Sequence, residues 1–180
     1  MKTLLLLVAL TTPALAYQTT EIDNGTFISQ GINRGETAYP TENSPELNVQ
    51  WSSSAKQMGA YFWFTETCSF SGEQLEIFKV NGQAISFAKL CRNGEILRVA
   101  KTLEGNSYIL NKLRELENDR VKFDTRRKQL AKQDEVPFVS PFDERLGGYG
   151  KWVADLTLDK WSFSSEGINR FLDDPTNKPL

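Results

Sequence analysis

A basic segment from Arg120 to Lys132 has the clearest potential for chemistry in this sequence. Six of its residues are basic and one, Asp124, is acidic, so its formal charge is +5. The basic residues are Arg120, Lys122, Arg126, Arg127, Lys128 and Lys132. Such clustering is typical of a site for an anionic partner, such as lipopolysaccharide, phosphate groups or an acidic glycan. An exposed polar segment whose charge only keeps the protein in solution has the same composition, so both interpretations stay open.

The remainder of the chain is acidic. The full chain has a formal charge of −2, which becomes −3 without Lys2, so the residues outside the basic segment then sum to −8. A dedicated nucleic-acid binder is usually basic overall. We therefore expect no nucleic-acid partner.

The chain contains no His and only two Cys. The absence of His excludes Ser-His-Asp and Cys-His catalysis and removes the commonest zinc ligand. Two Cys cannot form a four-cysteine zinc or iron–sulfur site. We expect neither a metal nor a cofactor, and we assign no catalytic residue.

Two weaker patterns could support hydrolysis without His. Ser-x-x-Lys spacing occurs at Ser53 and again at Ser86, but the second match falls inside a predicted strand, where residues three apart point to opposite faces. Carboxylate pairs can cleave glycosidic bonds. The candidate pairs are Glu73 with Glu76, Asp143 with Glu144, and Asp173 with Asp174. Nothing in the sequence distinguishes one pair from the others.

Four tryptophans could form a platform for stacking on sugars. They are Trp51, Trp63, Trp152 and Trp161. Each lies in a predicted strand, and large aromatic side chains in strands usually pack in the core. We therefore interpret them as core residues.

The first 16 residues have the three parts of a secretory signal peptide. Lys2 is the positive residue, residues 4–10 form an apolar run, and Ala14 and Ala16 form the small-residue pattern before a cleavage site. The apolar run is too short to cross a bilayer, which takes about 20 residues. We predict cleavage before Tyr17, export to the periplasm or the exterior, and no transmembrane segment in the mature chain.

Cys68 and Cys91 are predicted to form a disulfide. An even number of Cys in an exported chain favours a bridge over free thiols. Cys68 ends one predicted strand and Cys91 ends another that runs in the same direction, so both lie at the same side of the sheet. Sequence alone does not give the separation that a bridge requires.

Strand patterns dominate the centre of the chain. Aromatic residues 61–64 lead to Cys68, and strands are predicted at 75–80, 84–90 and 96–99. Asn81-Gly82 and Asn93-Gly94 separate the last three strands, and Asn-Gly between apolar runs indicates a two-residue type I′ hairpin. The pattern predicts an antiparallel meander.

A helix follows the strands. Asn106 or Ser107 is a suitable N-cap, and apolar residues from Ile109 to Leu116 fall on one helical face. A short strand is predicted at Val121 and Phe123, then a long polar excursion at 124–150. Another strand at 152–163 and a short C-terminal helix around Phe171 complete the pattern.

These elements predict an α+β fold, an antiparallel sheet with one principal helix packed on it and a short C-terminal helix. The expected division is a signal peptide at 1–16, a loosely ordered N-terminal segment at 17–46, a single domain at 47–173 and a tail at 174–180. A composition of 39% hydrophobic and 11% aromatic residues supports a folded chain.

Four short blocks give the sequence a family resemblance. They are residues 80–85 (VNGQAI), Cys91, residues 102–109 (TLEGNSYI) and residues 163–167 (FSSEG). They resemble a loose set of small exported proteins of Gram-negative bacteria, some carried on mobile gene cassettes. The likeness covers residues 60–124 and 160–172, and the polar stretch 124–150 departs from it. The resemblance implies a periplasmic or secreted setting and no catalytic residues.

The sequence therefore favours an exported, non-enzymatic binding or interaction protein of the bacterial envelope or exterior. Its candidate partners are an anionic envelope component, reached through the basic segment, or another protein. The alternative is a His-independent hydrolase that acts on cell-wall glycans through a carboxylate pair. These two functions differ in a structural requirement, since a hydrolase needs an acid pair in a concave pocket with one pKa raised.

Overall fold

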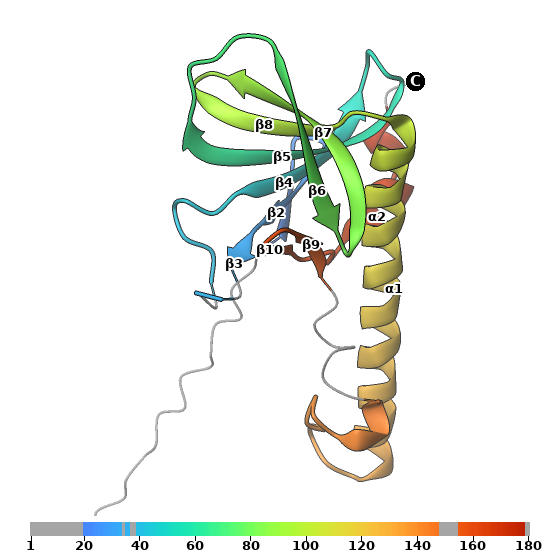
Figure 1. The fold of residues 1–180 in the computed structure, drawn as a ribbon. Coiled ribbons are helices and arrows are strands. Elements are labelled where there is room, and N and C mark those ends of the chain that lie inside the picture. Colours follow the sequence, from blue (N-terminus) through green and yellow to red (C-terminus); the bar gives the residue numbers. More distant parts are fainter. Residues whose placement is uncertain (1–19, 34, 37–38, 148–154, 179–180) are drawn as a thin grey trace, which may run out of the picture.

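The computed structural model describes residues 20–33, 35–36, 39–147 and 155–178. The predicted signal peptide and Trp152 lie outside these residues. The fold is α+β, as predicted, with one curled antiparallel sheet of ten strands, a long helix and a short C-terminal helix (Figure 1). The strands are β1 (Thr20–Asp23), β2 (Thr26–Gln30), β3 (Ile32–Asn33), β4 (Glu46–Ser52), β5 (Gln57–Thr67), β6 (Glu73–Val80), β7 (Gln83–Arg92), β8 (Glu95–Ala100), β9 (Leu156–Leu158) and β10 (Trp161–Phe163). The helices are α1 (Leu103–Gln133) and α2 (Ile168–Asp173).

The order of strands across the sheet is β1-β2-β4-β5-β8-β7-β6-β9-β10-β3. Only Gly31 separates β2, near one end of this order, from β3 at the other end, so the sheet must curl to bring the two ends together. Gly31 donates its N–H to the carbonyl of Pro45 at 2.7 Å. A Cβ atom here would lie 3.0 Å from Phe163 and from Pro45, so glycine suits this close approach.

Both predicted Asn-Gly hairpins are confirmed. Asn81 and Gly82 have φ of 46° and 87°, and Asn93 and Gly94 have φ of 54° and 86°. These left-handed values at both central positions define type I′ turns, which match the twist of the flanking strands. The turns join β6, β7 and β8 into a meander.

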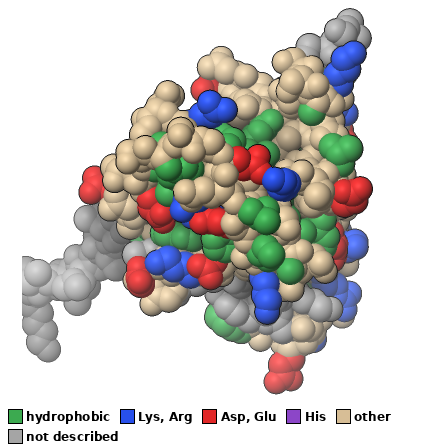
Figure 2. Space-filling model, turned by 45° about the horizontal axis from the view of Figure 1, so that its top comes forward, with side chains coloured by type: hydrophobic (Ala, Val, Ile, Leu, Met, Phe, Trp, Pro, Cys, Tyr) green, Lys and Arg blue, Asp and Glu red, His purple; other side chains and the backbone are tan. Residues whose placement is uncertain are grey.

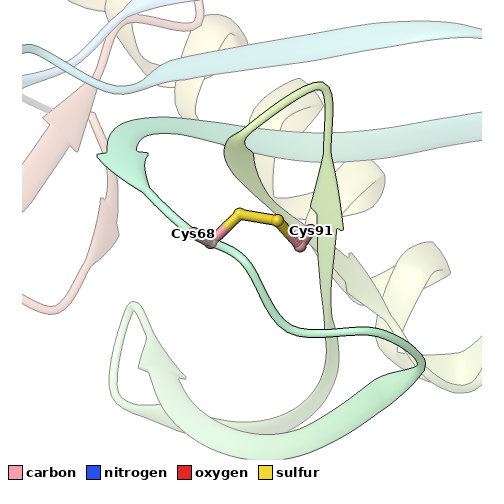
Figure 3. Close-up of a disulfide and its surroundings, with 2 residues drawn as sticks. All are labelled: Cys68 and Cys91. Atoms are coloured by element: carbon pink, nitrogen blue, oxygen red, sulfur yellow. A yellow bond between two sulfur atoms is a disulfide. The ribbon is translucent and has the colours of Figure 1, made fainter.

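The strand before this meander pairs differently from the prediction. β5 pairs with β8 and not with β6, from Tyr61↔Val99 to Thr67↔Glu95. The segment after Thr67 therefore crosses the end of the sheet to reach β6. Because β5 and β7 are both antiparallel to β8, they run in the same direction, and the predicted Cys68–Cys91 disulfide forms between their ends with Cα atoms 5.8 Å apart (Figure 3).

The N-terminal segment 17–46 is more ordered at residues 20–33 than the one short strand near residues 25–28 that its composition allows. These residues form β1, β2 and β3, and a third Asn-Gly turn at Asn24-Gly25 joins the first two. Phe27 is fully buried, pairs with Val49 of β4 and lies 6.1 Å from the ring of Phe171. This buried strand is hard to recognise in the sequence, because only alternate strand positions face the core and the residues between them are polar.

Helix α1 is much longer than predicted, and it begins earlier. Thr102 is its N-cap, with a hydroxyl that accepts a hydrogen bond from Gly105 N–H at 3.0 Å. The expected cap, Asn106, instead lies inside the helix and bonds the sheet. The helix continues to Gln133, so the short strand expected at Val121 and Phe123 does not form.

The predicted excursion at 124–150 is also wrong over most of its length. Its first ten residues belong to α1, and residues 134–147 fold back along the end of that helix (Figure 1). A small separate core joins the two parts; it contains Phe123, Leu130, Val139 and Leu146. Lys, Arg, Gln and Leu form helix readily, so the polar sequence here is compatible with helix once those apolar residues are covered.

The main core lies between the inner face of the curled sheet and the two helices. The ring of Phe62 on β5 packs 5.8 Å from Phe87 and 5.3 Å from Phe163. The predicted C-terminal helix α2 adds buried Phe171 to this core. Buried Glu117 of α1 holds the start of α2 by accepting a hydrogen bond from Gly167 N–H at 2.8 Å. The sheet and both helices thus form one packed unit.

Candidate functional site

The six predicted anion-binding residues all lie on α1, but the fold divides them into two groups. Arg120 and Arg127 are turned toward the rest of the protein. Arg120 Nη1 lies 2.6 Å from Glu166 Oε2, and Arg127 pairs with Asp124 at 3.4 Å. The Arg127 guanidinium also lies 5.3 Å from the ring centre of Phe138 on the returning segment. These two arginines therefore have structural partners.

The other four residues are exposed to solvent; they are Lys122, Arg126, Lys128 and Lys132. Lys122 and Arg126 are one helical turn apart, as are Lys128 and Lys132. Lys122 Nζ lies 3.4 Å from Asp119, an exposed pair of the kind that contributes little. Arg126, Lys128 and Lys132 form no ion pair with any residue that the structure describes. We call these four residues the basic face of α1.

Residues 134–147, which follow α1, place acidic side chains at the C-terminal end of that helix. Arg145 bonds both Asp134, with an N–O distance of 2.6 Å, and Asp143, at 2.7 Å. Hydrogen bonds from the Arg145 side chain and backbone lower the pKa of Asp143 to about 2, and its side chain lowers the pKa of Asp134. Residues 134–147 therefore fold as an ion-paired cap on the helix. Asp134 and Asp143 therefore place negative charge close to the basic segment, which the sequence did not suggest. The basic face itself still keeps its four cations.

A second candidate is a hollow of about 380 Å³ that the sequence did not reveal. It lies on the outer side of the sheet where β2, β4 and β5 are adjacent. In the register, Gln30 is paired with Glu46 and Glu46 with Trp63, so these three side chains stand in a row on one face. The lining residues are Gln30, Thr41, Glu42, Ser44, Glu46, Asn48, Trp63, Phe64, Thr65, Asn93 and Glu95.

The tryptophans divide between core and surface. Trp51 and Trp161 are partly buried against the main core, as predicted. Trp63 is half-buried and lines the hollow, so its interpretation as a core residue is wrong. Its strand alternates, with Phe62 and Phe64 facing inward and Trp63 facing outward. That alternation was visible in the sequence, but not which face would be covered.

A third cluster contains charges on the inner face of the sheet. Arg98 is buried between the rings of Phe64 and Phe78, with its guanidinium 4.1 Å and 5.2 Å from their centres. Its Nε donates to Glu76 Oε2 at 2.7 Å, and Lys89 Nζ lies 3.1 Å from Glu76 Oε1. Burial raises the pKa of Glu76, but hydrogen bonds and charge from Arg98 and Lys89 outweigh it, so the pKa lies below its ordinary value. We interpret this cluster as a structural ion network that the rings of Phe64 and Phe78 shield from solvent.

The predicted carboxylate pairs are bound up in other interactions; in the pair Asp143 and Glu144, Asp143 accepts hydrogen bonds from Arg145. Glu73 binds Lys101 on the outer face while Glu76 points inward. Asp173 pairs with Arg114 at 2.8 Å, and Asp174 caps the turn that follows α2. The described carboxyl groups with a displaced pKa all have it lowered, by basic partners or, for Asp174, by hydrogen bonds from Thr176. A general acid needs the opposite displacement.

The Ser-x-x-Lys patterns are not catalytic arrangements either. Ser86 faces outward on β7, while Lys89 faces inward and bonds Glu76. Ser53 and Lys56 lie in the turn between β4 and β5, and the hydroxyl beside them at Ser52 bonds Ser54 and Ala55 instead. No nucleophile with an adjacent base results from either pattern.

No protein-family model, curated protein or solved structure matches this chain. The resemblance to small exported bacterial proteins therefore stays a prediction. Within the part of the chain that the structure describes, no helix combines the length and apolar character needed to cross a membrane, and no cluster of acidic or cysteine side chains is suited to a metal ion. Among the described residues, the basic face of α1 and the hollow beside Trp63 are two surfaces with features of a binding site.

Proposed function

We propose that this protein is an exported, non-enzymatic binding protein of the bacterial envelope or exterior, and that it contacts an anionic envelope component through the basic face of α1. The observation that carries this proposal is the position of Lys122, Arg126, Lys128 and Lys132 on the half of α1 that extends past the sheet (Figure 1). Export is supported by the Cys68–Cys91 disulfide, since such bonds persist in oxidising compartments.

The geometry of the basic face suits a repeating polyanion. A helix rises 1.5 Å per residue, so Lys122 and Lys132 stand about 15 Å apart along its axis. At about 100° per residue, the pair Lys122 and Arg126 and the pair Lys128 and Lys132 form two rows about 120° apart around the axis, so the four cations spread over the solvent-exposed side of the helix. Arg126 adds a planar donor fork that binds a phosphate or sulfate group through two parallel hydrogen bonds. On an otherwise acidic protein, this face is a local attractive field for an anionic polymer.

The experiment is chromatography on immobilised heparin, with thermal unfolding as the fold control. We expect wild-type protein to be retained at low salt and released as salt rises. The variant Arg126→Gln/Lys128→Gln/Lys132→Gln should pass through unretained with a nearly unchanged melting temperature, because these side chains have no described partners.

A charge-matched variant separates this site from overall charge. Lys56→Gln/Lys79→Gln/Arg92→Gln removes the same charge from exposed positions outside α1 and should be retained like the wild type. If both triple variants lost retention equally, the net charge of the protein, and not the basic face of α1, would explain the retention. Wild-type protein that is not retained at low salt would refute the proposal.

The carboxylate hydrolase is the weaker candidate. It needs a general acid with a raised pKa, whereas Glu76, Asp143 and Asp173 are each held by basic partners that lower theirs. Binding without chemistry uses the features that the described residues do offer, namely a charged face and a polar hollow.

A further inference from the structure

The hollow on the outer face of the sheet is built from rigid parts. Its floor is the row Gln30, Glu46 and Trp63, held side by side by the ladder of β2, β4 and β5. One wall is the loop at 41–44, which is closed on itself, since Thr41 N–H donates to Ser44 Oγ at 2.8 Å and Ser44 N–H donates to the Thr41 carbonyl at 2.9 Å. The cavity is therefore preformed, as small-ligand sites usually are.

Polar groups surround one aromatic ring in this hollow. Trp63 supplies an apolar face, and Phe64 is the other aromatic residue among the described lining residues. The remaining lining residues all have side chains that donate or accept hydrogen bonds, and they come from four strands, a loop and a turn. Asn48 Nδ2 is buried and has no hydrogen-bond partner among the described residues. A ligand that fits this lining must carry many hydroxyl or amide groups and at least one flat apolar surface.

The charges narrow the class of ligand. Among the residues that the structure describes, no Lys or Arg lines the hollow, while Glu42, Glu46 and Glu95 do. A phosphate, sulfate or uronate group would be repelled by these carboxylates. The three carboxylates also do not converge into a group suited to a metal ion, so they are spread around the hollow as separate hydrogen-bond acceptors.

We propose that this hollow binds an uncharged saccharide. One sugar ring stacks its C–H face on the Trp63 indole, while its hydroxyl groups donate to the spaced carboxylates, Glu46 among them. The size of the hollow, about 380 Å³, is in the range of small-molecule sites and suits one or two sugar rings.

The test is isothermal titration calorimetry of the full exported protein with uncharged trisaccharides of glucose, galactose, mannose and N-acetylglucosamine. We expect at least one to bind. Trp63→Leu should weaken that binding on the order of tenfold, whereas Trp63→Phe, which keeps an aromatic face, should retain most of it. Phe138→Leu, an aromatic change at an exposed site on the α1 cap, should bind like the wild type.

Two further variants separate a saccharide from an organic cation, the other ligand that an acidic, aromatic hollow could hold. Glu46→Gln keeps an acceptor oxygen but removes the charge, so saccharide binding should persist; Glu46→Ala should weaken it several-fold, while exposed Glu21→Ala should not. Spermidine is titrated in parallel as the cation probe. Binding of spermidine but of no trisaccharide at millimolar concentration, or saccharide binding unchanged in correctly folded Trp63→Leu, would overturn the proposal.

Discussion

Replacing Asn106 with Ala tests how α1 is joined to the sheet. Its side chain is buried, and it bonds the backbone of β5 twice: Oδ1 accepts from Ala60 N–H at 2.9 Å, and Nδ2 donates to the Met58 carbonyl at 2.9 Å. The β8 neighbour of β5 is paired only from Tyr61 onward. The Asn106 amide therefore takes the place of a strand at the end of the ladder.

The expected cost follows from these two bonds. Each hydrogen bond contributes about 1 kcal/mol net, and a buried backbone group left without a partner costs about 1–3 kcal/mol. Both Ala60 N–H and the Met58 carbonyl lose their partner in Asn106→Ala. We expect a loss of about 2–5 kcal/mol in the free energy of unfolding, reduced slightly by the better helix propensity of Ala. That is a large fraction of the stability of a domain of this size.

Urea unfolding at constant pH measures this loss, and amide hydrogen exchange locates it. The Ala60 amide should exchange faster in Asn106→Ala than in the wild type. Asn111→Ala, an exposed substitution on the same helix, is the matched control and should be neutral or slightly stabilising. A loss below about 1 kcal/mol, with Ala60 still protected, would mean that the Asn106 bonds do not hold the helix to β5.

Three further predictions concern the disulfide, the turns and the cap on α1. Protein purified without reductant should gain two hydrogens in intact mass on reduction, and Cys68→Ala/Cys91→Ala should lose about 3 kcal/mol of stability. Two alkylatable thiols in the unreduced protein would contradict this. Gly82→Val and Gly94→Val should each cost about 1 kcal/mol or more, because both positions have positive φ, and unchanged melting of both variants would argue against these turns. The pKa of the Asp143 carboxyl falls from 3.8 to about 2 on folding, so this group stabilises residues 134–147 fully above about pH 4 and loses the effect as the pH falls toward 2. In an acid titration followed by nuclear magnetic resonance, the Asp143→Asn variant should lack the transition that the wild type shows in this pH range. An identical profile in the variant would contradict the prediction.

Local features of the sequence were sufficient for several elements. Asn81-Gly82 and Asn93-Gly94 predict their turns because the backbone conformation of a type I′ turn depends on the two residues that adopt it. The apolar period from Ile109 to Leu116 predicts the buried face of a helix for the same reason, since it needs only neighbours within two turns. The disulfide followed from the number of cysteines and the directions of their strands.

Contacts between distant segments decided the rest. The extension of α1 to Gln133 depends on Phe123 and Leu130, which look isolated in a polar sequence until residues 134–147 fold back and cover them. The division of the basic segment has the same origin, because Arg120 turns inward to reach Glu166, 46 positions later in the sequence. No local pattern encodes which acid will be within reach.

The pairing of strands was likewise a tertiary outcome. β5 joins β8 instead of β6 on one side, and on its other side the pairing with β4 places Trp63 on an outer face beside Glu46 and Gln30, where the hollow forms. Alternation in β5 predicts that Trp63 faces opposite to Phe62, but it cannot say which of the two faces α1 will cover. The sequence by itself therefore determined turns, helix periodicity and the cysteine pair, whose energetics are local, while the hollow and the basic face depend on hydrogen bonds and packing between segments that meet only in the folded chain.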